Sequence, residues 1–72
     1  MNIKEEISGL RQGQCLLYNE KLGKVIRFKN IFDAAKNALN HGRHNGNGWK
    51  MVDDIEVEYP SEEWQDLADV EL

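Results

Sequence analysis

The chain has almost none of the residues and segments from which covalent crosslinks and membrane spans are built. Only one of its 72 residues is a cysteine, Cys15, so an intramolecular disulfide is impossible and the composition fits a reducing compartment. No apolar run approaches the length that crosses a bilayer, and the first residues lack the apolar core of a signal peptide. We therefore expect one cytoplasmic domain over residues 1–72.

Residues that could carry catalysis or hold a metal are also few. Cys15 lies in an apolar segment with no base nearby in sequence, which is typical of a buried thiol rather than a nucleophile. His41 and His44 lie three residues apart, but no cysteine or carboxylate accompanies them at a spacing typical of zinc sites. No glycine-rich phosphate loop follows a predicted strand. The sequence therefore predicts no enzyme, no metal site and no cofactor.

Positive charge is absent from the last third of the chain. Residues 1–50 carry nine Lys and Arg against four Asp and Glu, which leaves a net charge of +5. Residues 51–72 carry nine Asp and Glu and no Lys or Arg, a net charge of −9, so the chain as a whole has −4. Such an asymmetry between halves affects which partners the chain attracts and the electrostatic field around it, and it does not indicate a particular fold.

Hydrophobic periodicity predicts three helices, over residues 2–11, 30–41 and 61–70. In each range the apolar side chains recur at the three- and four-residue spacing of one helix face. The N-cap residues expected for the three helices are Asn2, Asn30 and Ser61. The apolar stripe of the central helix consists of Ile31, Phe32, Ala35, Ala38 and Leu39, and its alanines favour direct packing on a sheet.

Alternating apolar residues predict three strands, over residues 14–18, 24–29 and 49–59. The first two strands flank a loop of hairpin length, in which Gly23 can adopt a positive φ. An unbroken third strand places Asp53 on the same side as Ile55, Val57 and Tyr59. We expect a bulge or kink at Asp53 and Asp54 to resolve this conflict, since a tight turn favours Asn-Gly.

The order of elements predicts an α+β fold. We expect a small antiparallel sheet of about three strands, with the central helix packed on one face and short N- and C-terminal helices. Residues 42–48 hold three glycines and two asparagines and are predicted to form a loop. A sheet this small leaves an open edge, so we also expect that the chain can form a homodimer.

The acidic stretch is the strongest indication of function in the sequence. The third strand and the last helix should be folded into the domain, which fixes their carboxylates in a pattern. One interpretation is a solvated face with salt bridges to the basic half. The other is a docking surface for a basic protein partner. The partner-binding residues predicted in that second case are Asp54, Glu56, Glu58, Glu62, Glu63, Asp66 and Asp69.

Two classes of function are compatible with this surface and with the basic half. The first is a non-enzymatic interaction protein, such as an inhibitor or nucleic-acid mimic of the size and character that phages encode against host or defence enzymes. The alternative is a nucleic-acid-binding accessory protein, disfavoured by the net charge of −4. The residues predicted for that alternative, around the basic hairpin and the 42–48 loop, are Lys24, Arg27, Lys29, Arg43, His44 and Lys50.

Overall fold

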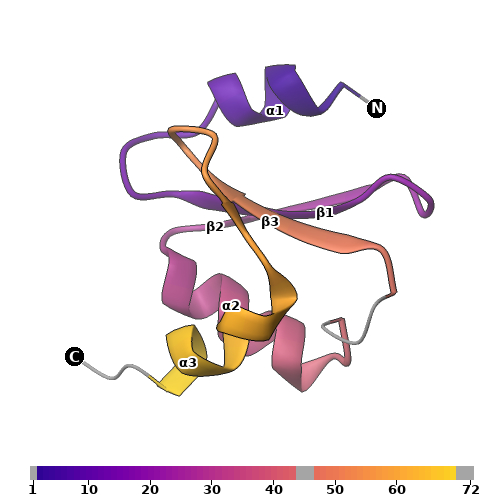
Figure 1. Ribbon diagram of the computed structural model, residues 1–72. Helices are drawn as coiled ribbons and strands as arrows, with labels where there is room; N and C mark the ends of the chain where they lie inside the picture. The colour runs from indigo at the N-terminus through magenta and orange to yellow at the C-terminus, as the bar shows by residue number, and fades with distance from the viewer. Residues whose placement is uncertain (1, 44–46, 70–72) are drawn as a thin grey trace.

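The computed structural model of the chain describes residues 2–43 and 47–69, in which one antiparallel sheet lies between helices (Figure 1). The strands are β1 (Cys15–Asn19), β2 (Lys24–Phe28), β3 (Trp49–Asp53) and β4 (Glu58–Tyr59), in the spatial order β2-β1-β3-β4. The helices are α1 (Ile3–Ser8), α2 (Ile31–Asn40) and α3 (Trp64–Asp69). The predicted α+β class is confirmed, and the sheet has one short strand more than the three expected.

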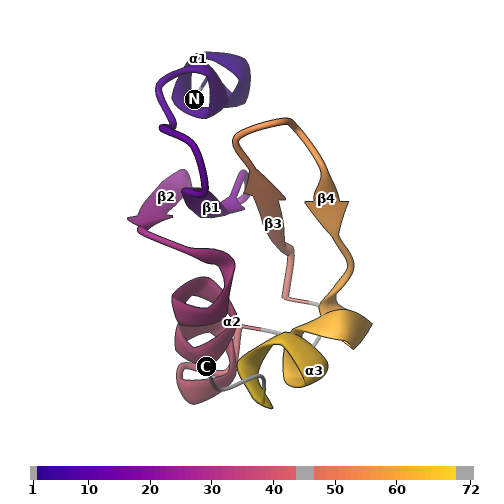
Figure 2. The ribbon, with the colours of Figure 1, turned by 90° about the vertical axis from the view of Figure 1, so that its left-hand side faces the viewer.

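The helices cover both faces of the sheet. Figure 2 shows α1 above the sheet and α2 with α3 below it, where α2 and α3 pack against each other. Within the described residues, none of the helices combines the length and the apolar character needed to cross a membrane. The central helix packs on one face, as predicted, and α1 adds a layer on the opposite face.

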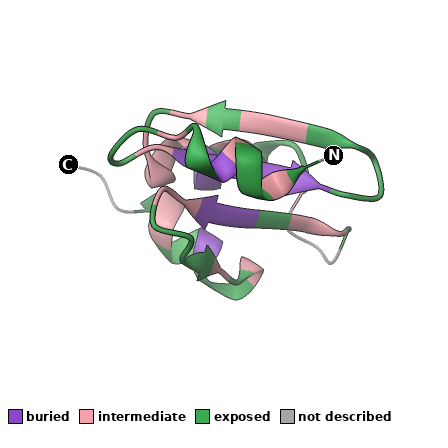
Figure 3. Cartoon of the chain, turned by 90° about the horizontal axis from the view of Figure 1, so that it is seen from above, coloured by how far each residue is buried: buried purple, intermediate pink, exposed green. Residues whose placement is uncertain are grey.

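Strand β1 is the centre of this arrangement, because all five of its residues are buried. Its side chains alternate between two apolar clusters. The cluster toward α2 and α3 contains Cys15, Leu17, Ala34, Ala35, Ala38, Met51 and Trp64. The cluster toward α1 contains Ile7, Leu16, Tyr18 and Val52. Buried residues accordingly gather in the central strands (Figure 3).

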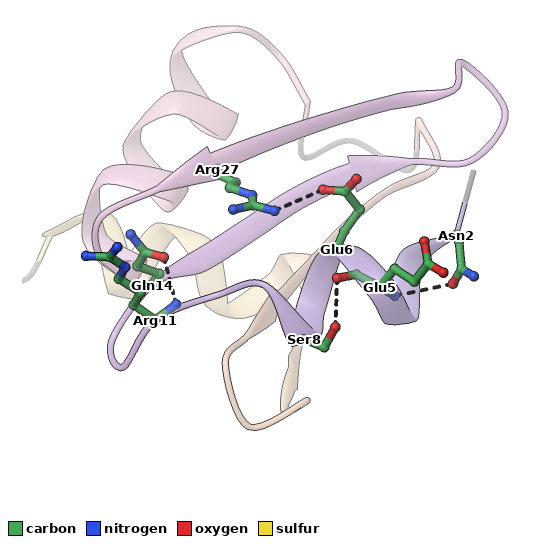
Figure 4. Close-up of polar contacts among 7 residues, drawn as sticks. All are labelled: Asn2, Glu5, Glu6, Ser8, Arg11, Gln14 and Arg27. Carbon is green, nitrogen blue, oxygen red and sulfur yellow. Dashed lines mark hydrogen bonds and ion pairs between the residues drawn. The ribbon is translucent and has the colours of Figure 1, made fainter.

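The predicted caps of the first two helices are confirmed. Asn2 Oδ1 accepts a hydrogen bond from the Glu5 amide at 3.3 Å, and Asn30 Oδ1 accepts one from the Asp33 amide at 2.8 Å. These side chains satisfy amide groups that have no partner in the first turn of a helix. Helix α1 is joined to β2 by an ion pair between Glu6 and Arg27, 3.3 Å apart (Figure 4).

The third helix begins differently from the prediction. Ser61–Glu63 form a 3₁₀ turn, η1, and Pro60 stands at its N-cap without a side-chain hydrogen bond, so the prediction of Ser61 as a cap is wrong. Proline suits this position because its fixed φ enters a helical turn without needing an amide proton. The apolar side of α3 packs inward as predicted, with Trp64 only 1% exposed.

Residues 49–59 form a hairpin and not one kinked strand. β3 ends at Asp53, and the chain reverses so that Met51 pairs with Tyr59 and Val52 with Glu58. The predicted bulge at Asp53 and Asp54 is therefore wrong. The sequence pattern misled because Ile55 and Val57 continue the alternation of β3 through residues that belong to a turn.

Asn19 connects the β1–β2 hairpin to the loop that precedes β3. Its side chain is fully buried; Nδ2 donates to the Asn47 carbonyl at 3.0 Å, and Oδ1 accepts from the Leu22 amide at 3.1 Å. Gly23 has φ 64° in the same hairpin, the positive φ predicted for it. One polar side chain thus orders two connections at the same end of the sheet.

We predict that Asn19→Ala lowers the free energy of unfolding by about 1–3 kcal/mol, because it leaves the Leu22 amide and the Asn47 carbonyl without partners. Urea denaturation measures the change. The control is Asn40→Ala, at an exposed site in α2, which should cost nothing because alanine has the better helix propensity. Equal losses in the two variants would contradict a special role for Asn19.

Candidate functional site

The turn between β3 and β4 is organised by the side chain of Asp53. Its Oδ1 accepts hydrogen bonds from the Ile55 amide at 3.1 Å and the Val57 amide at 2.9 Å. Its Oδ2 accepts one from the Tyr59 hydroxyl at 2.9 Å. The hydrogen bond with Asp53, followed by burial, raises the pKa of Tyr59. Asp53 thus lies on the apolar side of the sheet, as its position in the alternation requires, and both of its oxygens are bonded.

The backbone of this turn is also tightly defined. The Asp53 amide donates to the Val57 carbonyl at 3.2 Å, and the Glu56 amide donates to the Asp53 carbonyl at 3.2 Å. Glu56 has φ 64°, a conformation that is uncommon for residues other than glycine. Aspartate here takes the place of the Asn-Gly pair that tight turns favour, because its carboxylate receives the amide protons that reversing the chain would leave free.

Two branched apolar side chains are exposed on this turn. Ile55 is 72% exposed and Val57 is 43% exposed, whereas their alternation with Tyr59 predicted that they would be buried. The prediction fails because the chain leaves the sheet after Asp53 and, in the part of the chain that the structure describes, no second layer covers residues 55–57. Tyr59, which returns to the sheet in β4, packs against the apolar cluster as predicted.

The predicted partner-binding carboxylates do not lie in one strand but are spread over the β3–β4 turn, β4, η1 and α3, which together we call the acidic side. Of Asp54, Glu56 and Glu58, only Glu58 belongs to a strand, so the regular row of charges expected along residues 54–58 does not form. The turn lies at the α1 end of this side, and η1 and α3 lie at the opposite end (Figure 2). The other predicted residues belong to η1 and α3 and are exposed: Glu62, Glu63, Asp66 and Asp69.

None of these carboxylates forms an internal ion pair within residues 2–43 and 47–69. The two ion pairs there, Arg27 with Glu6 and Lys29 with Asp33, both lie in the first half of the chain. Glu58 instead accepts a 3.4 Å hydrogen bond from the Tyr18 hydroxyl, and burial, followed by the charge of Glu58, raises the pKa of Tyr18. Among the described residues the acidic side thus has no internal salt bridges, and both interpretations of the sequence, a solvated face and a docking surface, stay predictions.

The basic residues predicted for nucleic-acid binding are distributed over several surfaces. Lys24 and Arg27 lie in β2, at the sheet edge opposite β4, and Lys50 lies in β3. Arg43 lies 4.9 Å from the centre of the Trp49 ring and donates to Asn37. Lys29 is in the ion pair already described, and His44 lies outside the described residues. Several of these cations thus already contact other residues of the same chain.

A hollow of about 320 Å³ lies where β4 leaves β3 and the chain enters η1. Its lining is formed by Trp49, Lys50, Met51, Glu58, Tyr59, Pro60, Ser61 and Trp64. The Trp64 indole is fixed there by a 2.8 Å hydrogen bond from Nε1 to the Tyr59 carbonyl. The volume is at the lower limit of small-molecule sites, about 300–1,000 Å³. The hollow combines aromatic walls with one lysine and one glutamate.

Cys15 is fully buried, and burial, followed by the charge of Asp53, raises the pKa of its thiol to about 12. A thiol in this environment stays protonated at neutral pH, which is typical of a structural cysteine. Across residues 2–43 and 47–69, no group of three or more His, Cys, Asp or Glu side chains is arranged to hold a metal ion.

We predict that Asp53→Ala loosens the β3–β4 turn and lowers the free energy of unfolding by about 1–3 kcal/mol, because three donors lose their acceptor. Hydrogen exchange at the Ile55 and Val57 amides should accelerate. Asp54→Ala is the matched control, since it removes a neighbouring carboxylate that accepts neither amide proton. Unchanged exchange in Asp53→Ala would contradict the role given to this side chain.

Burial of Cys15 predicts a pH dependence of stability. The folded thiol has a pKa of about 12, above its ordinary value of 9.0, so the unfolded state loses this proton first as pH rises. The contribution is complete below about pH 9 and disappears as pH rises toward 12. The difference in unfolding free energy between the intact chain and Cys15→Ala should therefore shrink over this range. A constant difference in urea denaturation at pH 7 and pH 10 would contradict it.

The chain has been compared with known proteins in three ways. No family model, no curated protein and no solved structure matches the chain. No residue role is therefore transferred from a relative, and any function has to follow from the contacts, burial and charge of the residues described above.

Proposed function

We propose that the chain is a non-enzymatic protein-interaction domain that binds a basic protein surface through its acidic side. The observation that carries this proposal is the β3–β4 turn. There, exposed Ile55 and Val57 alternate with the carboxylates of Asp54, Glu56 and Glu58 on a backbone ordered by Asp53. Apolar side chains that contact a partner, surrounded by charges that select it, are a common arrangement of protein interfaces.

The charges and the apolar residues have separate roles in this proposal. Carboxylates without internal ion pairs attract a basic partner from a distance and accelerate association. Ile55 and Val57 lose contact with water when the partner binds and so contribute most of the affinity. Because Asp53 and the backbone hydrogen bonds already order the turn, little conformational entropy is lost on binding.

The finer form of the proposal is an inhibitor that acts as a nucleic-acid mimic. Its negative charges would occupy a surface on which a nucleic-acid-binding enzyme holds phosphates, as small phage proteins do with host or defence enzymes. In that case DNA should displace the chain from its partner. With a single, buried cysteine, the chain is suited to the reducing cytoplasm, where we place this interaction.

The test measures how much reversing the charge of two carboxylates weakens the binding of a partner. A protein captured by the intact chain is purified, and its affinity is measured by calorimetry for the intact chain and for the double variant Glu62→Lys, Asp66→Lys. We expect about tenfold weaker binding, since like charges then face the basic partner, and tenfold corresponds to about 1.4 kcal/mol.

The matched control is the double variant Glu5→Lys, Glu20→Lys, which changes net charge equally but alters exposed sites elsewhere. It should bind nearly as well as the intact chain. Equal losses in both variants would show that net charge alone matters and would reject the acidic side as the site. Tight, salt-sensitive retardation of DNA by the chain itself would instead support the nucleic-acid-binding alternative.

A further inference from the structure

The segment that joins α2 to β3 contains an asparagine followed by a glycine twice, as Asn45-Gly46 and as Asn47-Gly48 (Figure 1). In such a pair the backbone nitrogen of the glycine can attack the asparagine side chain, because glycine has no side chain that hinders the approach. The first pair lies outside the described residues. The second lies within them, and Asn47 is exposed to water. The contacts of Asn47 therefore show what controls this reaction.

Both reacting groups of the Asn47-Gly48 pair are held by hydrogen bonds. Asn47 Nδ2, the atom that leaves as ammonia, donates to the Gly42 carbonyl at 2.9 Å. The Asn47 carbonyl accepts a hydrogen bond from Asn19 Nδ2 at 3.0 Å. That carbonyl and the Gly48 nitrogen belong to the same planar peptide group. The bond from Asn19 thus fixes the orientation of the attacking nitrogen.

Asn19 is a rigid support for this peptide group. Its side chain is fully buried, and Oδ1 accepts from the Leu22 amide at 3.1 Å, which fixes the side-chain amide in one orientation. Gly48 lies against it: a β-carbon on Gly48 would be 3.5 Å from both Nδ2 and Oδ1 of Asn19. Gly48 also has φ 90°, which side chains disfavour. The fold thus favours glycine after Asn47, and this preference creates the reactive pair.

We propose that Asn47 is a site of spontaneous deamidation and that Asn19 controls its rate. The Gly48 nitrogen forms a bond to Asn47 Cγ, the bond from Cγ to Nδ2 breaks, and ammonia leaves with the proton that the attacking nitrogen gives up. Water then opens the resulting cyclic imide at either of its carbonyl groups, which yields aspartate or isoaspartate at position 47. Water is the only co-reactant. The proposal does not depend on the proposed function.

The attack occurs in molecules in which this loop has opened. Ring closure has to rotate the Asn47 side chain and its peptide group, and the hydrogen bonds to Gly42 and from Asn19 hold both of them. Loops open locally far more often than a whole domain unfolds. The rate of modification therefore depends on how firmly Asn19 holds the Asn47 carbonyl.

The products do not restore these contacts. A carboxylate has no proton to donate, so the Gly42 carbonyl loses its partner. In isoaspartate the main chain also runs through the former side chain. The carbonyl that Asn19 bonds then becomes part of a free carboxylate, and an additional methylene group enters the backbone ahead of β3. The modification is therefore one-way and loosens the end of the sheet at which β3 begins.

Mass spectrometry of the purified chain after incubation at mildly alkaline pH tests the proposal. Trypsin cleaves after Arg43 and Lys50, so both Asn-Gly pairs fall in one short peptide. Its fragments show which asparagine has gained the mass of a carboxyl group in place of an amide. We expect modification at Asn47, at a rate several-fold higher in Asn19→Ala than in the intact chain. No modification of Asn47, or equal rates in the two proteins, would overturn the proposal.

The variant Asp53→Ala separates local opening from a general loss of stability. Asp53 lies at the opposite end of the ladder between β1 and β3 from Asn19, and its replacement is expected to destabilise the fold to a similar extent. It should leave the rate at Asn47 unchanged, because the contacts of that residue stay intact. If Asp53→Ala accelerates the reaction as much as Asn19→Ala does, the modification proceeds through global unfolding and the control given to Asn19 is rejected.

Two substitutions at position 47 test the chemistry and its consequence. Asn47→Gln has to close a larger ring and should stay unmodified there; modification at an equal rate would reject the mechanism. Asn47→Asp has the charge of the products and an ordinary main chain. The isoaspartyl chain, purified by ion exchange, should unfold at a lower urea concentration than Asn47→Asp, since it alone also alters the carbonyl that Asn19 bonds. Equal stability of the two would reject the role given to that bond.

Discussion

The enclosure of β1 is the constraint on which the rest of the structure depends. A strand with all five residues buried needs a neighbour along each edge and a helical layer over each face. β2 and β3 supply the edges, α1 covers Leu16 and Tyr18, and α2 with α3 covers Cys15 and Leu17. A small domain gains a sufficient core in this way because one strand is buried from four directions.

Two polar residues that end strands, Asn19 and Asp53, are buried and half-buried respectively. Asn19 closes β1 and bonds two loops, and Asp53 closes β3 and accepts protons from the turn that follows. In both cases a short side chain replaces a partner that the backbone loses where the ladder ends. The exposed β3–β4 turn is consequently an ordered feature, which is the property that recognition by Ile55 and its acidic neighbours requires.

The order of the strands determines where the basic and acidic residues lie in the fold. The sequence separates a basic half from an acidic last third, and the order β2-β1-β3-β4 places the basic strand β2 and the acidic strand β4 at opposite edges. The basic and acidic parts of the sequence are thus separated across the sheet, and the proposed interaction with a basic partner uses the acidic part.

The sequence by itself determined the class of fold, the caps Asn2 and Asn30, and the β1–β2 hairpin, because these depend on local propensity and periodicity. It also indicated which residues are acidic. Only the tertiary structure decided that Ile55 and Val57 are exposed, because burial depends on whether another layer lies above them and alternation carries no such information. The positions of the carboxylates likewise depend on β3 ending at Asp53. That end is fixed by the hydrogen bonds that Asp53 accepts in the folded chain.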